Sequence, residues 1–126
     1  MEVSERLAAL RLIRSENVGP VTYRQLIERF GGASAALDAL PELARLGGRR
    51  RSLKIHPREA AERELEILEE HGGRSLVLGE SAYPAWLAAL PDAPPVLMTL
   101  GPVGLAERRC VAVVGARNAS LSLIHI

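Results

Sequence analysis

Residues 110–120 read CVAVVGARNAS, an apolar run that opens onto a glycine-containing turn with an arginine. The run at residues 110–114 has the composition of a short buried strand, and Gly115 lets a ligand approach the backbone closely. Arg117 offers a planar set of donors to a phosphate, and Ser120 is placed to cap a following helix. The same pattern also fits a strand-ending turn whose arginine faces solvent. We expect a strand here, followed by a candidate phosphate site.

The composition of the 126-residue chain restricts both the core and the partners. Hydrophobic residues make up 48% but aromatic residues only 3%, so we expect an aliphatic core without an aromatic platform for base stacking. The net charge of +1 means that any attraction to nucleic acid must come from local clusters. The single cysteine, Cys110, excludes an internal disulfide, and we expect it in the core as a small hydrophobic residue.

The amino terminus lacks the order of a signal peptide, and no apolar run approaches the roughly 20 residues that cross a bilayer. We therefore expect a cytoplasmic protein without membrane contact.

Helical periodicity dominates the first half of the chain. Apolar side chains recur at helical spacing from residue 3 to residue 13, with Ser4 as the expected cap. After a break at residues 17–20, Thr22 and Gln25 have the spacing of a capping box. Further helices are expected to begin at Ser34, Pro41 and Pro57.

The pattern changes near Gly73. Short apolar runs predict strands at residues 76–78, 96–100 and 110–114, with a helical turn at residues 86–90 between the first two. We therefore expect a helical module at residues 1–73 and an α/β part that begins at residue 74.

The link Asn17-Val18-Gly19-Pro20 has the composition of a helix-hairpin-helix. In that element the glycine lets the backbone lie against a phosphate, and amides at the start of the second helix donate to it without reading sequence. A plain corner between two helices fits equally well. Tyr23 and Arg24 could add a stacking ring and a phosphate donor, or be ordinary surface residues.

Arg49, Arg50 and Arg51 form the one place where three like charges adjoin. Such runs are usually solvated loops, and if this one binds DNA it neutralises about two or three phosphates, which gives weak, salt-sensitive affinity. A second surface would have to add to it.

No catalytic constellation, metal site or cofactor motif is visible. The histidines, His56, His71 and His125, are scattered singly, and Ser81 lies in no nucleophile elbow. The glutamates between residues 59 and 70 have the pattern of the solvated side of a helix. We expect neither an enzyme nor a bound cofactor.

Several segments, taken in order, resemble the DNA-processing protein A (DprA/Smf) family. They are Val18-Gly19-Pro20, Phe30-Gly31-Gly32, Tyr83-Pro84 with Leu87, DAPPVL at residues 92–97, Gly101, and VVGARNAS at residues 113–120. The resemblance implies a small sterile-alpha-motif-like or helix-hairpin-helix domain before an extended Rossmann domain, an α plus α/β fold. The resemblance covers about residues 5–120.

The resemblance also implies a function. Family members are non-enzymatic proteins that bind single-stranded DNA during DNA uptake in natural transformation and help to load the RecA recombinase. Full-length relatives form homodimers. Carried over to this sequence, the DNA pocket would contain Gly115, Arg117 and Ser120.

The sequence departs from the family pattern after Ser120. We expect a truncated form that spans the start of a Rossmann-like DNA-binding domain at residues 74–120, with an atypical tail at residues 121–126. Two other functions stay open. One is a nucleotide-phosphate-binding Rossmann enzyme, and the other is a module that binds DNA through its helix-hairpin-helix only.

Overall fold

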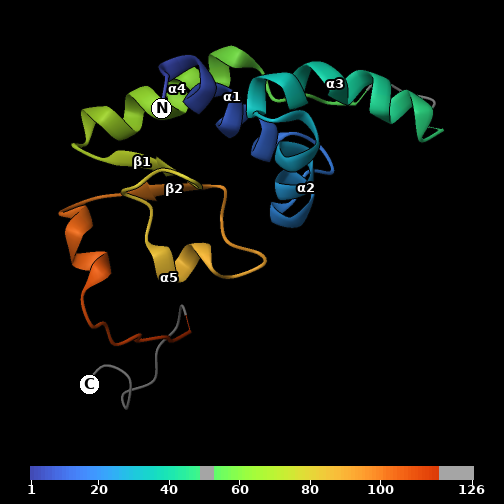
Figure 1. Cartoon of the computed structure of the whole chain (residues 1–126). Helices are drawn as coiled ribbons and strands as arrows, with labels where there is room; N and C mark the ends of the chain where they lie inside the picture. The colour runs from blue at the N-terminus through green and yellow to red at the C-terminus, as the bar shows by residue number, and fades with distance from the viewer. Residues whose placement is uncertain (49–52, 117–126) are drawn as a thin grey trace.

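A computed structural model describes residues 1–48 and 53–116. Four helices precede a small sheet (Figure 1). The elements are α1 (Val3–Arg14), α2 (Pro20–Phe30), α3 (Ala33–Leu46), α4 (Arg58–Glu70), β1 (Arg74–Val77), α5 (Ala85–Ala88), β2 (Val96–Thr99) and the 3-10 helix η1 (Val103–Glu107). Helices α1 and α4 lie over one face of the sheet, and α5 lies on its other side (Figure 1). The predicted order, a helical module before a strand-containing part, is confirmed.

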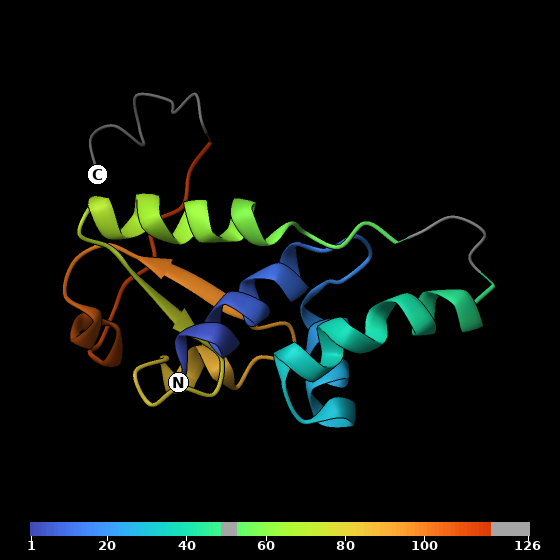
Figure 2. The same cartoon turned by 90° about the horizontal axis from the view of Figure 1, so that it is seen from above.

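Helix α1 is the central element of the core. Leu10 and Leu12 are fully buried, and α1 passes between α3 and α4 (Figure 2). Leu12 packs with Ala36 of α3, whereas Leu10 packs with Ala61 of α4. Because these apolar side chains leave α1 on different sides, this helix contributes to both core clusters of the protein. Val3, expected on the same apolar face, is instead 82% exposed.

The side-chain caps predicted for α1 and α2 are wrong. Helix α1 begins at Val3 with Glu2 at the N-cap, and α2 begins at Pro20 with Gly19 at the N-cap. Neither N-cap makes a side-chain capping hydrogen bond. Proline fits the first helical position because its fixed φ suits a helix and its missing N–H would have no partner there. Thr22 is therefore already inside the helix and cannot cap it.

Pro41 lies inside α3 instead of starting a separate helix. A proline in a helix removes one backbone hydrogen bond. The apolar face nevertheless continues across it, since Leu37 and Leu40 are buried and Leu43 packs against the same cluster. Burial of this face keeps the helix continuous.

The start of α3 is capped by a side chain from α1. The Glu5 carboxylate accepts hydrogen bonds from the amides of Ala33 and Ser34 and, at 2.8 Å, from the Ser34 hydroxyl. Burial opposes the charged form of Glu5, but these three hydrogen bonds outweigh it and lower its pKa. A Cβ on Gly32 would stand only 3.0 Å from the carboxylate, so the glycine leaves room for this contact. One glutamate thus ties two helices together.

Replacing Glu5 with alanine is expected to lower the free energy of unfolding by about 1 to 2 kcal/mol, as loss of a helix cap does. The stabilisation from a carboxyl with a lowered pKa is present above its unfolded pKa and is lost as pH falls through the folded pKa. Urea unfolding of wild type and Glu5→Gln should therefore differ at neutral pH and converge in acid. The control is Glu2→Ala, which removes an exposed side chain without a capping bond. Equal effects at the two positions would contradict the capping role.

The strands β1 and β2 pair antiparallel, with Arg74 opposite Thr99 and Val77 opposite Val96. Leu76 and Val77 are almost fully buried, and Val77 belongs to the same core cluster as Leu12 of α1 and Ala36 of α3. At the turn into β1, a Cβ on Gly73 would lie 2.8 Å from the Thr99 carbonyl oxygen. Only glycine allows the chain that leaves α4 to pass this close to β2 as it enters β1.

The free edge of β1 is occupied by an ion pair. Arg6 of α1 donates to the Ser75 carbonyl at 2.8 Å and to Glu80 at 2.7 Å, while Glu80 accepts from the Val77 amide at 2.7 Å. Side chains thereby satisfy the Ser75 carbonyl and the Val77 amide, two of the backbone groups that β1 turns away from β2. We call this arrangement the Arg6–Glu80 clamp. It fixes the helical module to the sheet and closes one sheet edge to further strands.

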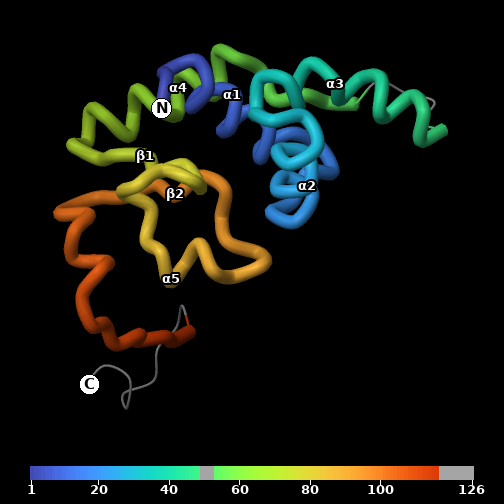
Figure 3. The backbone as a smooth tube through the Cα atoms, in the orientation of Figure 1, coloured from blue at the N-terminus to red at the C-terminus, as the bar shows by residue number. Residues whose placement is uncertain are grey.

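The predicted third strand is not formed. Residues 110–114 are extended but pair with no strand in the described part of the chain. Val111 is 91% exposed and Val114 is 87% exposed, and Cys110 is exposed instead of lying in the core. A strand needs a partner for its backbone groups, and the β1–β2 pair is not extended to this segment. After η1 the chain runs beneath α5 (Figure 3).

Candidate nucleic-acid interface

The α1–α2 connection is a tight, fixed hairpin. Asn17 adopts a left-handed conformation with φ of 64°, and the Val18 side chain is buried. The Val18 amide donates to the Ser15 carbonyl at 3.3 Å. The buried valine and the turn together hold the following backbone in place.

The start of α2 presents backbone donors to solvent. Gly19 is exposed, and a Cβ there would meet nothing within 4 Å. Pro20 has no N–H, and the amides of Val21 and Thr22 have no acceptor within residues 1–48 and 53–116. Free amides and the positive end of the helix dipole favour an anion at this position. The backbone of Gly19, with φ of −98°, does not itself require glycine, so its contribution is an open approach.

The chain returns beside this hairpin after residue 52. The Glu16 amide donates to the Lys54 carbonyl at 2.9 Å, and the His56 amide donates to the Ser15 hydroxyl at 3.1 Å. Sequence reasoning missed this contact because the residues are far apart in the chain and have no shared pattern. The predicted basic run, Arg49, Arg50 and Arg51, lies outside the described residues, directly before this returning segment.

Tyr23 and Arg24 have structural roles. The Tyr23 side chain is 4% exposed, and its burial together with the nearby Glu5 charge raises its pKa to about 12. Arg24 donates to the carbonyls of Ala88 at 3.3 Å and Leu90 at 3.2 Å, at the end of α5. A buried ring cannot stack on a base. The idea that these two residues extend the hairpin surface is therefore not supported.

The second predicted site falls at the end of the described chain. Gly115 is exposed in the extended segment, and Arg117 and Ser120 lie outside the described residues. Arg108 and Arg109, which the sequence analysis did not single out, are exposed at the start of the same segment. In the sequence, only their position directly before the apolar run could have marked them as candidates.

The two candidate regions are separate. The hairpin lies beside α2, whereas residues 110–116 lie beneath α5 in Figure 1 and away from α2 in Figure 2 as well. The structure does not bring Gly19 and Gly115 together.

Residues 1–48 and 53–116 hold no group of three metal-ligating side chains. None of the helices in the same ranges has the length and apolar composition that crossing a bilayer requires.

The described chain is a helical module followed by a strand-containing part, and a family model matches each of the two. Residues 3–66 match the DprA-like N-terminal HHH domain, where HHH denotes helix-hairpin-helix. Residues 74–126 match DNA recombination-mediator protein A. No curated protein matches the chain.

The chain belongs to the DprA family, whose members process DNA in recombination and natural transformation. The predicted fold class, a helical module followed by the first strands of a Rossmann-like domain, is confirmed. The division at residue 73 and the atypical tail at residues 121–126 stay predictions.

Proposed function

We propose that this protein binds single-stranded DNA during DNA uptake and helps to load the RecA recombinase on it. The observation that carries the proposal is the pair of family matches, which together cover residues 3–66 and 74–126. The second match includes the turn with Gly115 and Arg117. The proposed role is non-enzymatic and cytoplasmic, and it requires no cofactor.

The principal DNA contact is assigned to the turn after residue 114. Gly115 admits the phosphate to the backbone, Arg117 pairs with it, and Ser120 starts the next helix with amides directed at the same group. This assignment comes from the sequence pattern, which falls within the recombination-mediator match.

The hairpin is proposed as a second, weaker contact. Its support is the exposed Gly19 and the free amides of Val21 and Thr22. Arg49, Arg50 and Arg51 precede, in the sequence, the segment that is hydrogen-bonded to the hairpin, and we propose that their charge adds to this contact. Both contacts recognise phosphates, which agrees with binding that does not read sequence.

The partners follow from the same role. RecA and a second copy of this protein are the proposed protein partners. Both would contact parts of the Rossmann-like domain.

A comparison of single-stranded and duplex DNA tests the proposed function. Fluorescence anisotropy with a labelled oligo(dT) is expected to give saturable binding that weakens steeply with added salt, since phosphates supply most of the affinity. A duplex of equal length should bind more weakly. Binding that favours the duplex would instead support a DNA-binding module that uses only its hairpin.

A further inference from the structure

An open groove lies between α1 and α4, on the side of the sheet away from α5. Two adjoining hollows form it, of about 370 Å³ and 440 Å³, and both are lined by Val3, Leu65 and Glu69. The helices converge at one end and diverge at the other (Figure 2). We call this feature the α1/α4 groove.

The groove has an apolar floor that the described chain leaves uncovered. Val3 is 82% exposed, and Leu65 and Leu68 are only partly buried. An exposed valine beside two partly buried leucines is the type of surface that accepts the apolar side of another helix. The stretch of α4 from residue 58 to residue 69 is about 17 Å long, which matches roughly three turns of such a helix.

The charge on the α4 side of the groove is negative. Helix α4 contains six glutamates and two arginines in a chain whose net charge is +1. Glu62 and Glu66 make only exposed ion pairs along their own helix, at 2.8 Å and 3.4 Å. Exposed pairs of this kind contribute little and exchange readily for new partners.

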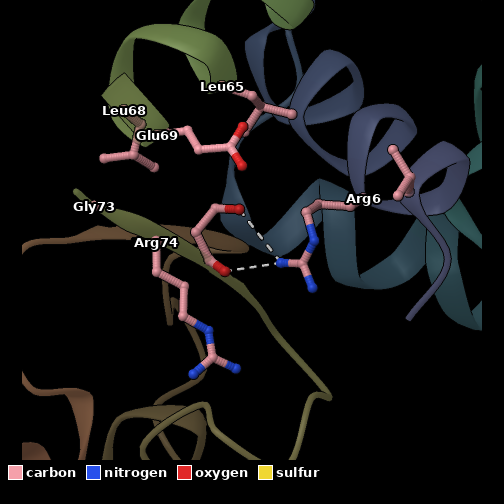
Figure 4. Close-up of a pocket in the computed structure, with 8 residues that line it drawn as sticks. Arg6, Leu65, Leu68, Glu69, Gly73 and Arg74 are labelled. Carbon is pink, nitrogen blue, oxygen red and sulfur yellow. Dashed lines mark hydrogen bonds between the residues drawn. The ribbon is translucent and has the colours of Figure 1, made fainter. Parts of the chain in front are cut away.

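Glu69 is the free acidic group at the centre of the groove. It makes no ion pair within the described ranges, and its carboxylate faces the hollow (Figure 4). The two nearby cations do not neutralise it. The guanidinium of Arg6 is hydrogen-bonded to Ser75, and that of Arg74 points away from Glu69 (Figure 4).

We propose that the α1/α4 groove binds a basic amphipathic helix of a partner protein. Leucine-like side chains of that helix would lie on Val3, Leu65 and Leu68, while its lysines or arginines would face Glu69, Glu66 and Glu62. DNA is repelled from this face by the same glutamates. The proposal goes beyond DNA binding, because it assigns protein recognition to a surface that phosphates avoid.

The test uses the full chain and a synthetic probe. The probe is a fluorescein-labelled, 14-residue helical peptide of leucine and lysine with all leucines on one side. Its binding is measured by fluorescence anisotropy. Saturable binding is expected, and each of the substitutions Glu69→Lys and Val3→Glu should lower the affinity for the peptide at least tenfold. Val3 is so exposed that its replacement should leave the helices intact, which circular dichroism would check.

The matched control is Glu70→Lys, which makes the same change of charge one residue along α4. Glu70 faces Arg63 at 3.7 Å and does not line either hollow, so a change below twofold is expected. Absence of saturable binding would overturn the proposal. Equal losses of affinity from the substitutions at positions 69 and 70 would overturn it as well. So would a peptide of leucine and glutamate that binds as tightly as the leucine and lysine probe.

Discussion

Arg6→Ala is expected to lower the free energy of unfolding by about 2 to 4 kcal/mol, because breaking a largely buried ion pair leaves a charge without its partner. The side chains of Arg6 and Glu80 are only 22% and 12% exposed. The substitution also removes the donor to the Ser75 carbonyl at 2.8 Å. Urea unfolding followed by circular dichroism measures the change.

The control for this substitution is Arg63→Ala on the exposed face of α4. Arg63 is 62% exposed and faces Glu66 and Glu70, so its loss should change stability by less than about 1 kcal/mol. Equal effects of the two substitutions would refute the clamp as a major contact between the helical module and the sheet.

The pH dependence of the clamp has a defined sign. Burial disfavours the charged form of Glu80, but hydrogen bonds from Arg6 and the Val77 amide, with the positive charges of Arg6 and the amino terminus, lower its pKa overall. A carboxyl with a lowered pKa stabilises the fold above its unfolded pKa, and this stabilisation disappears as pH falls through the folded value. The difference between wild type and Glu80→Gln should therefore be present at neutral pH and shrink in acid.

Arg117→Ala is expected to weaken binding to oligo(dT) by about 5- to 150-fold, which corresponds to the 1 to 3 kcal/mol of a charge-assisted hydrogen bond. Arg117→Lys should recover only part of the affinity, since a lysine keeps the charge but not the planar set of donors. Anisotropy titrations at low salt measure both variants.

Arg108→Ala serves as the comparison for Arg117→Ala. Arg108 is exposed in the same segment and carries the same charge, but it precedes the apolar run and lies outside the predicted turn. A general attraction to basic side chains would give both substitutions the same effect. A specific phosphate contact requires a clearly larger loss at position 117.

Local periodicity was sufficient to predict most of the helical module. Leu7 and Leu10 are buried as their spacing predicted, and Ala61 of α4 is fully buried. Helix caps were harder to predict, because the residue that caps α3 is Glu5, which comes from another helix. Sequence patterns report neighbours within about one turn, whereas this contact depends on how α1 and α3 pack.

The same limit explains the errors in the second half. Residues 110–114 have the composition of a strand, but pairing depends on a neighbouring strand that the segment itself does not encode. The Arg6–Glu80 clamp joins residues 74 positions apart, and no local signal marked either of them. Tyr23 looked like a surface ring because its position after the hairpin did not reveal that α2 turns it into the core.

The candidate site was predictable only in part. Composition identified the hairpin around Gly19, and the structure places it at the exposed start of a helix. The α1/α4 groove was not predicted, because its lining comes from residues at both ends of the helical module. Its acidic side had been interpreted simply as the solvated face of a helix.

The salt dependence of binding tests most directly whether Arg117 holds a phosphate of single-stranded DNA. Affinities of wild type and Arg117→Ala for oligo(dT) would be measured over a series of salt concentrations, and the logarithm of each would be plotted against the logarithm of salt. Loss of one phosphate contact should make the slope shallower by about 0.7 for a single strand. Parallel plots for the two proteins would contradict the assignment, since Arg117 would then neutralise no phosphate.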